Sequence, residues 1–426
     1  EKPGIWVVSW TWIIRMKELS YLEKLLDGAE VEWVALNKLA TFLKGKSLPK
    51  EKITPDGNRY CIHYGELFTH YGPIIDKVCS KTNQAINESI LSEKNDVLMP
   101  TSDVTPRGLA TASCIQESGV ILGGDILIIR CSGVDGRYPS NFIINNKKKI
   151  LQMVKGSTVY HLYAKDIGKL LIPIPCPNNP EKSLAIQSEI VRILDKFTAL
   201  TAELTAELSM RKKQYNYYRD QLLSFKEGEV EWKALGEIGE VRMCKRILKS
   251  QTSSEGEIPF YKIGTFGKEP DSYISRKLFN EFKEKYSYPK VGEVLISASG
   301  TMGRTVIFDG RESYFQDSNI VWIENNEKIV LNKYLFYFYK IAKWGISEGG
   351  TIKRLYNDNL RKLMIPVPFP DSPERSLVEQ QKIVKLLDKF DALTNSITEG
   401  LPREIELRQK QYEYYRDLLF SFPKPE

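Results

Sequence analysis

Several residue types and patterns are scarce or missing in this chain of 426 residues, and their absence narrows its function. It has three histidines and six cysteines, with no C-x-x-C pair and no His or Cys spacing typical of a metal site. It contains no GxxxxGK[ST] nucleotide loop, no Asn-Pro-Pro-aromatic motif of amino-methyltransferases and no recognisable nuclease cluster of Asp, Glu and Lys. These absences favour a binding scaffold without a catalytic centre, metal or cofactor.

Long hydrophobic runs are also missing, so we expect no membrane segment. The apolar stretch at residues 4–14 is too short to span a bilayer and lacks a signal-peptide cleavage pattern. Residues 1–15 match nothing else in the chain, and they are interpreted either as a non-native leader or as an extra apolar strand. Unpaired thiols favour a reducing cytoplasm. The net charge of +7 permits a polyanionic partner without requiring one.

The most informative feature present is an internal repeat. Residues 170–197 return nearly unchanged as residues 363–390, and residues 211–220 return as residues 408–417. The segment Glu-Val-Glu-Trp also occurs twice, ending at Trp33 and at Trp232. Such a duplication predicts a pseudo-two-fold molecule. Because the two halves differ between these anchors, we expect two different surfaces mounted on equivalent joints.

The repeated segments are predicted to be long helices that pack antiparallel. Asn179-Pro180-Glu181 and Ser372-Pro373-Glu374 each combine a capping residue, a proline at the first helical position and an acid in the first turn. Apolar residues then recur at heptad-like spacing and predict a helix-helix spacer. The predicted spacer residues are Ile190, Phe197, Leu204, Leu208, Ile383, Phe390, Ile397 and Leu401. Thr-Ala-Glu-Leu occurs in tandem only in the first copy, and a kink or break is expected at residues 400–402 in the second.

The fold class expected from this pattern is mixed α/β, with two globular domains joined by the two helices. Short apolar runs such as residues 125–130, 293–297 and 319–323 predict strands within the inserts. The expected segments are residues 1–15 (unassigned leader), 16–30 (N-terminal helix), 31–178 (domain 1), 179–228 (central helix), 229–371 (domain 2) and 372–426 (C-terminal helix).

Basic, amide and aromatic side chains near glycine-rich loops are candidates for contacts with DNA bases and phosphates. In the first insert the candidates are Lys44, Lys46, Arg59, His63, Tyr64, Arg107, Arg137 and Tyr138. In the second they are Lys245, Arg246, Tyr261, Lys262, Ser299, Gly300, Thr301, Arg304, Gln316, Lys353 and Arg354. Lys147, Lys148 and Lys149 are interpreted as a solvated loop.

Together these motifs resemble the specificity subunits of type I restriction-modification systems. The resemblance extends over nearly the whole chain from about Met16, and it rests on the paired Ile-Pro-Ile/Val-Pro segments, the Leu-Asp-Lys-Phe helices, the Lys-Gln-Tyr-x-Tyr-Tyr-Arg-Asp helix ends and the loop at residues 295–304. It implies two target-recognition domains on two antiparallel helices, each domain reading one half of a split double-stranded DNA sequence. It also implies two docked methyltransferase subunits and, through them, motor-nuclease subunits. The tandem Thr-Ala-Glu-Leu is similar to that of a branch in which the unit number sets the target spacer.

Two details qualify the expectation. In the first insert, residues 99–107 stand where the second has its Ser-Gly-Thr-Met-Gly-Arg loop, so the contacts of the first domain are less firmly assigned. Residues 21–26 resemble residues 218–223, which makes the duplication circular. Two alternatives stay open: a coiled-coil scaffold that binds two proteins, and a self-contained DNA methyltransferase whose motifs have drifted.

Overall fold

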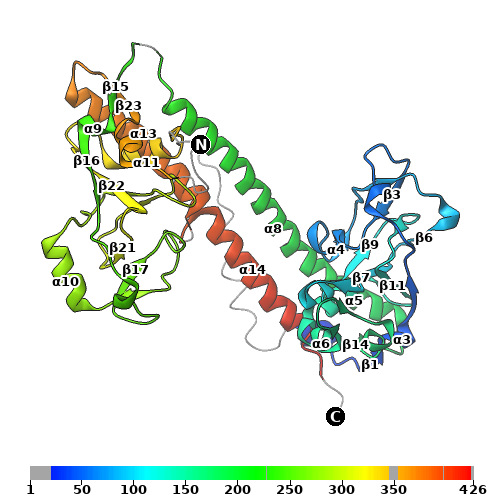
Figure 1. The fold of residues 1–426 in the computed structure, drawn as a ribbon. Helices are drawn as coiled ribbons and strands as arrows, with labels where there is room; N and C mark the ends of the chain where they lie inside the picture. The colour runs from blue at the N-terminus through cyan, green and yellow to red at the C-terminus, as the bar shows by residue number, and fades with distance from the viewer. Residues whose placement is uncertain (1–20, 227, 345–353, 397, 424–426) are drawn as a thin grey trace. The chain divides into compact units, whose positions relative to one another are not determined.

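The computed structural model describes residues 21–226, 228–344, 354–396 and 398–423 (Figure 1). The leader interpreted at residues 1–15, the candidate Lys353 and the spacer residue Ile397 lie outside the described residues. The chain forms two compact units. Unit 1 ends at Glu203 and resumes at Ile405, and unit 2 comprises the residues between them. No helix in the described ranges is long and apolar enough to cross a membrane.

Domain 1, the mixed part of unit 1, is built on a five-stranded sheet in the order β2-β11-β7-β9-β4. Its strands are β2 (Ala40–Lys44), β11 (Ile126–Cys131), β7 (Val97–Pro100), β9 (Ser113–Ile115) and β4 (Ile74–Ile75). The central strands β11 and β7 are hydrophobic and almost entirely buried, as expected for strands covered on both faces.

Smaller sheets flank it and carry the loops discussed below. One has the order β5-β3-β10-β6, and another β12-β13-β8. These strands are β5 (Lys81–Thr82), β3 (Arg59–Ile62), β10 (Ile121–Leu122), β6 (Ile90–Leu91), β12 (Lys155–Gly156), β13 (Tyr160–His161) and β8 (Ser102–Asp103). Helices α5 (Arg137–Asn145) and α6 (Lys147–Met153) follow β11.

Domain 2, the mixed part of unit 2, repeats this plan with fewer strands. One sheet has the order β16-β22-β19-β20, and the other β18-β17-β21. Its strands are β16 (Gly239–Met243), β22 (Ile320–Asn325), β19 (Val294–Ser297), β20 (Thr305–Ile307), β18 (Tyr273–Ile274), β17 (Ile258–Tyr261) and β21 (Tyr314–Phe315). Its helices are α10 (Arg276–Lys285), α11 (Asn332–Tyr339) and α12 (Asn357–Arg361). The strands expected at residues 125–130, 293–297 and 319–323 are confirmed as β11, β19 and β22 to within a few residues.

Each domain closes on a two-stranded sheet from which a long helix starts. In unit 1, β1 (Val31–Ala35) pairs antiparallel with β14 (Leu171–Pro175), and in unit 2, β15 (Val230–Ala234) pairs with β23 (Met364–Pro368). The residue after β14, Cys176, and its counterpart Phe369 both have left-handed backbone, with φ of 51° and 50°. This shared turn directs the chain from the sheet into a proline-led helix.

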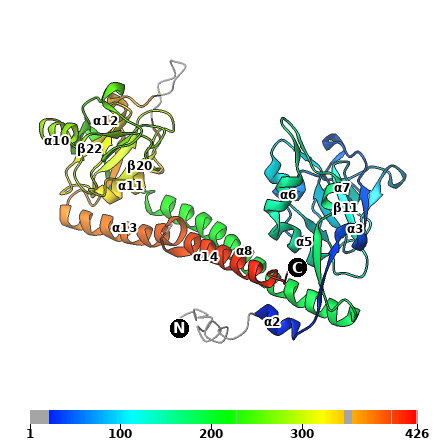
Figure 2. The same ribbon diagram turned by 90° about the horizontal axis from the view of Figure 1, so that it is seen from below.

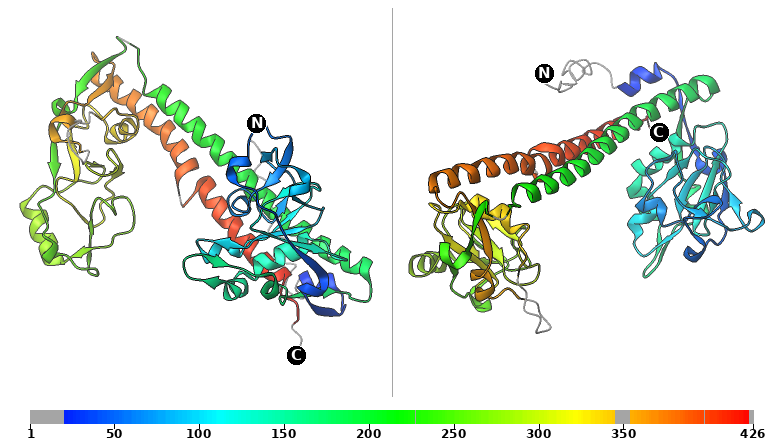
Figure 3. Two further views of the ribbon diagram at one scale, coloured as in Figure 1. Left: turned by 45° about the vertical axis from the view of Figure 1, so that its right-hand side comes forward. Right: turned by 90° about the horizontal axis from the view of Figure 1, so that it is seen from above.

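The long helices confirm the expected scaffold. They are α8 (Pro180–Leu222, 43 residues), α13 (Pro373–Asn395) and α14 (Gly400–Leu419). The break expected in the second copy is present, because α13 ends before Gly400, whose φ is +74°. Figure 3 shows α13, in orange, running along domain 2, and Figure 2 shows α2 (Tyr21–Leu26) beside the start of α8.

The predicted spacer residues pack in matching ways within each unit. In unit 1, Phe197 of α8 stacks on Tyr415 of α14, at 5.2 Å between ring centroids. In unit 2, Phe390 of α13 stacks on Tyr218 of α8, at 5.5 Å. Ile190 and Ile383 are buried in the two cores, whereas Leu204, Leu208 and Leu401 are partly exposed. In unit 1 the core also contains residues of α8 that precede Phe197, packed with residues that follow Tyr415 of α14. The two helices therefore pack antiparallel there.

Candidate nucleic-acid interface

The same buried hydrogen bonds recur where each domain leads into its long helix. The Tyr138 hydroxyl donates to the Pro173 carbonyl at 2.7 Å, and the Tyr334 hydroxyl donates to the Pro366 carbonyl at 3.0 Å. Both tyrosines have no exposed surface. Tyr138 was predicted to contact DNA, and that prediction is wrong, because a side chain buried in the joint cannot reach a ligand.

A second repeated bond completes this joint. The side-chain oxygen of Gln187 in α8 accepts from the Asp135 backbone N–H at 3.3 Å, and that of Gln380 in α13 accepts from the Leu331 N–H at 2.9 Å. Each glutamine therefore satisfies a backbone donor just before α5 or α11, where a helix start leaves N–H groups without partners. Each tyrosine thus joins α5 or α11 to the strand that leads into a long helix, and each glutamine joins the long helix itself to the segment before α5 or α11.

Arg137 also belongs to the joint of domain 1. Its guanidinium pairs with Asp135 at 2.6 Å, and it lines an open hollow against α8 with Ser188, Arg192, Asp195, Lys196 and Ala199. Arg137 therefore contributes to the joint of domain 1, and its role as a DNA contact stays a prediction.

The loop after β7 in domain 1 and the loop after β19 in domain 2 occupy the same position in the fold. The Thr101 N–H donates to the Asp125 carbonyl at 2.8 Å, and the Ala298 N–H donates to the Asn319 carbonyl at 2.8 Å. Thr101 in turn accepts from Leu162, at 3.0 Å, as Ala298 accepts from Leu355, at 2.8 Å. Ser102 then pairs with His161, and Ser299 with Arg354.

These bonds align residues 102–107 with residues 299–304 without a gap. Each loop begins with serine and ends with arginine, at Arg107 and Arg304. The absence of the glycine pattern in domain 1 therefore reflects a different sequence in an equivalent loop. In domain 2 the loop turns at Gly300 and Gly303, with φ of +65° and +74°.

Polar side chains hold the loop of domain 2 in shape. The Ser299 hydroxyl donates to Asn319 Oδ1 at 2.8 Å, Arg304 Nη1 donates to the Phe266 carbonyl at 3.0 Å, and Arg354 Nη2 donates to the Ser318 carbonyl at 3.0 Å. Each guanidinium carries five N–H donors, so one bond fixes its position and leaves donors for a ligand. Thr301 and Gly300 form the exposed tip.

A turn after the first strand of each small sheet lies against these loops. In domain 1 the His63 and Tyr64 rings lie 4.5 Å apart, and Tyr64 contacts Phe68, which lies beside Gly108 at the end of the loop. Burial, followed by the charge of Lys50, lowers the pKa of His63, so its imidazole is neutral near pH 7. We call residues 63–68, 102–107 and 160–161 surface 1.

The corresponding turn of domain 2 contains several predicted contacts. Lys262 forms an ion pair with Asp271 at 2.9 Å, and the Gln316 side-chain oxygen accepts from the Ile263 N–H at 3.0 Å. Tyr261 stacks on Phe315. Ile263 lies next to Gly300, so the turn and the loop are neighbours. We call residues 261–265, 299–304 and 354 surface 2, with Gln316 as its internal support.

The remaining predicted contacts lie on exposed positions outside these loops. Lys44 is the last residue of β2, and Lys46 follows that strand. Arg59 is the first residue of β3, and Lys245 and Arg246 follow β16. Lys245 lies over the Tyr286 ring at 5.2 Å. They are available to solvent, but no described contact places them in surface 1 or surface 2.

Surface 1 also contains residues that were not in the predicted set, among them Val104, Tyr160 and His161. The repeat itself contained the signal for His161, because it aligns that residue with Arg354. The lysines at 147–149 were interpreted as a loop, but they begin helix α6. Burial, then the charges of Arg107 and Arg416, lowers the pKa of Lys147, so both arginines lie within electrostatic range of this lysine.

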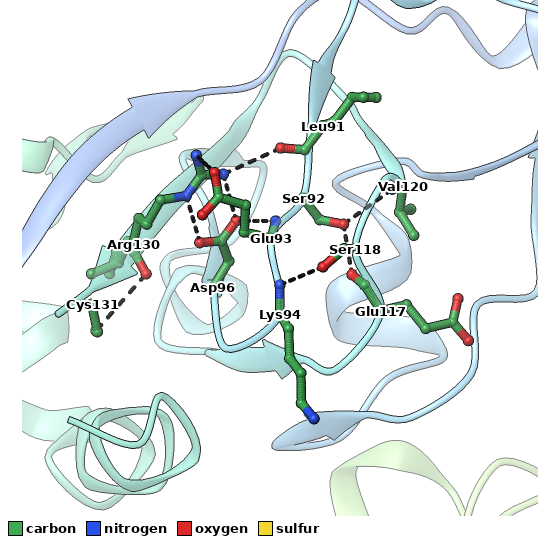
Figure 4. A network of polar contacts seen from close by, with 11 residues as sticks. Leu91, Ser92, Glu93, Lys94, Asp96, Glu117, Ser118, Val120, Arg130 and Cys131 are labelled. Carbon is green, nitrogen blue, oxygen red and sulfur yellow. Dashed lines mark hydrogen bonds and ion pairs between the residues drawn. The ribbon is translucent and has the colours of Figure 1, made fainter. Parts of the chain in front are cut away.

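An ion-pair network supports the strands behind surface 1. Figure 4 shows the Arg130 guanidinium between Asp96, which it contacts through two bonds of 2.9 and 2.8 Å, and Glu93, at 2.6 Å. The pair at the same place in domain 2 is reversed in sign, with Lys290 bonded to Glu324 at 2.8 Å. Arg130 therefore has a structural role that joins β11 to the start of β7.

Comparison with known proteins agrees with this arrangement. A family model described as a type I restriction modification DNA specificity domain matches residues 29–210 and 227–407. The Haemophilus influenzae protein S.HindORF215P, named as a type I restriction enzyme specificity subunit, is 47% identical, covering 95% of this chain and 98% of that protein. The EcoR124I/EcoR124II specificity subunit of Escherichia coli is 38% identical over 96% of this chain and 99% of its own length.

A solved structure shares the fold. The S subunit of a type I restriction-modification system from M. genitalium has a TM-score of 0.56 and 16% sequence identity, covering 93% of this chain and 98% of that one. The chain therefore belongs to the type I restriction-modification DNA specificity subunits, the non-catalytic DNA-recognition components of these systems.

Proposed function

We propose that domain 1 (residues 31–178) and domain 2 (residues 229–371) each read one half of a split DNA target, through surface 1 and surface 2. The observation that carries this proposal is the combination of shared tyrosine and glutamine bonds with different loops. Tyr138 and Tyr334 make the same bond, whereas the loops at residues 102–107 and 299–304 share a backbone position and differ in most side chains. Equivalent placement with different contacts suits two different half-sites.

Arg304 is the side chain of surface 2 best placed for base recognition, because its guanidinium is positioned by Phe266 and keeps free donors. Replacing Arg304 by Ala is expected to weaken binding to target DNA by about 1–3 kcal/mol if it contacts a base edge. Arg311→Ala is the matched control, since that side chain is 88% exposed and lies outside surface 2. Equal losses in gel shifts with both variants would contradict this assignment. Lys353 remains a predicted contact of the same surface.

The long helices are proposed to set the spacing between the half-sites. Helix α8 runs unbroken through the tandem Thr-Ala-Glu-Leu, and the boundary between the two units falls inside that tandem, after Glu203. Deleting residues 205–208 shortens the helix by about 6 Å, at ~1.5 Å per residue. One base-pair step is ~3.4 Å, so the spacer should shorten by one or two base pairs while both half-sites stay the same. Sequencing of methylated positions in cells tests this, and an altered half-site with an unchanged gap would refute it.

The outer face of the distal helix ends is proposed as the docking site for two methyltransferase subunits, one on each unit. Exposed residues on this face are identical in the two copies, whereas residues on the adjacent face differ. The identical residues are Lys213, Tyr217 and Asp220 in α8, and Lys410, Tyr414 and Asp417 in α14. The differing pairs are Ser209 and Glu406, Lys212 and Gln409, and Asn216 and Glu413.

The spacing of the identical residues supports a binding face. Positions 213, 217 and 220 are separated by four and three residues, so they lie on one side of the helix. Tyr217 and Tyr414 are 61% and 64% exposed, although each ring contacts that of the next tyrosine, and exposed tyrosines are enriched at protein interfaces. Two equivalent faces fit two copies of one protein, and restriction subunits would join through the methyltransferase.

The number of bound methyltransferase subunits tests this docking face. Tyr217→Ala or Tyr414→Ala alone should remove one copy, and the double variant should remove both, by analytical ultracentrifugation. Asn216→Ala, on the face that differs, should leave two copies bound. We further propose that the chain acts in the cytoplasm and has no methylation activity of its own. Stoichiometric binding of S-adenosylmethionine in isothermal titration would contradict the latter.

A further inference from the structure

Val104, at the tip of the loop in surface 1, is the most exposed large apolar side chain in the described ranges. Its exposed fraction is 73%. The loop holds it in one position, because Asp103 accepts from the Val104 N–H at 2.7 Å and from the Thr105 hydroxyl at 2.8 Å. Pro106 then fixes the next backbone angle. A β-branched side chain that is held in one position and faces water loses little conformational freedom when it binds a ligand.

The cations near this loop favour a polyanionic ligand, although the Asp103 carboxylate lies beside Val104. Arg107, three residues after Val104, is exposed, and it lies close enough to Lys147 for their charges to interact. Arg416 at the end of α14 adds a third cation to the same part of unit 1, where it is paired with Asp417 at 3.4 Å. Phosphates of a DNA backbone would relieve the repulsion among these cations. The apolar tip would then face the interior of a groove.

We propose that Val104 packs on the 5-methyl group of a thymine in the major groove of the half-site bound by domain 1, with Arg107 and Lys147 against the flanking phosphates. Thymine is the base that offers a methyl group there, and an aliphatic side chain without donors or acceptors can discriminate bases only by such a contact. This inference rests on the proposed function, because it assumes that domain 1 reads a half-site. The equivalent residue of domain 2 is Thr301, which adds a hydroxyl to its methyl group.

Binding to DNA in which single thymines are replaced by deoxyuridine tests this contact, because deoxyuridine lacks only the methyl group. The target is first defined by sequencing DNA methylated by the assembled complex. The half read by domain 1 is the half that changes when residues 31–178 are exchanged for those of the Haemophilus influenzae relative. Affinities of the full chain with its methyltransferase are then measured for each deoxyuridine duplex, with the parent chain, Val104→Ala and Val291→Ala. Val291 is 72% exposed in domain 2 and is the matched control.

One thymine position in the half-site of domain 1 should carry the effect. Deoxyuridine there should weaken binding of the parent chain and of Val291→Ala by about four-fold, the contribution of one buried methyl group. Val104→Ala should bind the thymine duplex more weakly and should not respond to that deoxyuridine. Three results overturn the inference and leave the proposed function intact, provided that binding stays target-specific. The half-site of domain 1 has no thymine, no thymine in it is sensitive to the replacement, or Val104→Ala is as sensitive as the parent chain. If instead the insert exchange changes neither half-site, the proposed function fails.

Discussion

The joints between each domain and its long helix share the tyrosine and glutamine bonds, but they differ in the contacts of one equivalent aspartate. Asp195 and Asp388 occupy equivalent positions in the repeated Leu-Asp-Lys-Phe segment. In unit 2, Asp388 pairs with Lys333 at 2.7 Å and accepts from the Tyr337 hydroxyl at 2.6 Å. In unit 1, Asp195 has no hydrogen bond or ion pair with the residues that the structure describes. The aspartate at this equivalent position is therefore bonded in unit 2, whereas in unit 1 it lines an open hollow.

The neighbouring residues explain the difference. Tyr337 is replaced by Asn141, whose amide donates instead to the Arg137 carbonyl at 2.9 Å, and Lys333 is replaced by Arg137, which pairs with Asp135. Both potential partners of Asp195 are therefore engaged elsewhere.

A second ion pair follows the same division. In unit 2, Lys340 pairs with Asp391 at 3.2 Å and lies over the Phe336 ring at 4.2 Å. The corresponding residues in unit 1 are Ile144 and Thr198. The comparison shows that the buried tyrosine and glutamine bonds are common to both joints, whereas the charged groups around them differ.

The largest expected effect comes from removing the shared part of the joints. Tyr138→Ala and Tyr334→Ala should each reduce the free energy of unfolding by about 3–5 kcal/mol, because each creates a cavity in a buried aromatic site. The corresponding Phe variants keep the ring and leave only the proline carbonyl unsatisfied, so they should cost about 1–2 kcal/mol. Urea denaturation followed by circular dichroism measures both series. The joints are not energetically equivalent if Tyr138→Ala and Tyr334→Ala differ in their loss of unfolding free energy by more than the two phenylalanine variants do.

A smaller loss is expected from the bonded aspartate of unit 2. Asp388→Asn removes the charge that pairs with Lys333 and weakens the bond to the buried Tyr337 hydroxyl. The ion pair is half exposed and contributes little, so most of the expected loss of about 1–2 kcal/mol comes from the tyrosine hydrogen bond. Thermal unfolding at neutral pH gives the value. Lys333→Gln, which removes only the exposed cation, should reduce the free energy of unfolding less than Asp388→Asn does. A larger loss with Lys333→Gln would mean that the ion pair provides most of the stabilisation.

Much of this architecture could be predicted from the sequence, because the repeat and the helix signals are local. The proline-led starts of α8 and α13, the break before Gly400 and the buried strands were all expected on that basis. The roles of individual aromatic and basic residues could not be predicted in the same way. Tyr138 and Arg137 have the residue types of a DNA contact, and only the fold reveals that one is buried and the other paired. Conversely, Val104 carries no polar group, so residue type gave no reason to select it.

The smallest effect, and the one with the opposite sign, is expected at the open joint. Burial raises the pKa of Asp195 to about 6, and the charges of Asp76 and Asp135 add to the rise while Arg137 opposes it. An unfolded aspartate titrates near pH 3.9. Between these values the folded protein binds more protons than the unfolded chain, so the contribution of Asp195 to stability falls as the pH rises from about 4 to 6 and stays unfavourable above that. Asp195→Asn should therefore stabilise the protein at pH 8.

The expected gain is about 1 kcal/mol, because solvent in the open hollow screens part of the penalty. The gain should shrink as the pH falls below 6 and should disappear near pH 4, where the parent aspartate is protonated. Thermal unfolding of both proteins from pH 4 to pH 8 gives the difference at each pH, and Asp388→Asn is the control, since its change should remain destabilising at pH 8. A destabilised Asp195→Asn at pH 8 would mean that Arg137, Arg192 or Lys196 stabilises the carboxylate in solution, and that the two joints are more alike than their hydrogen bonds indicate.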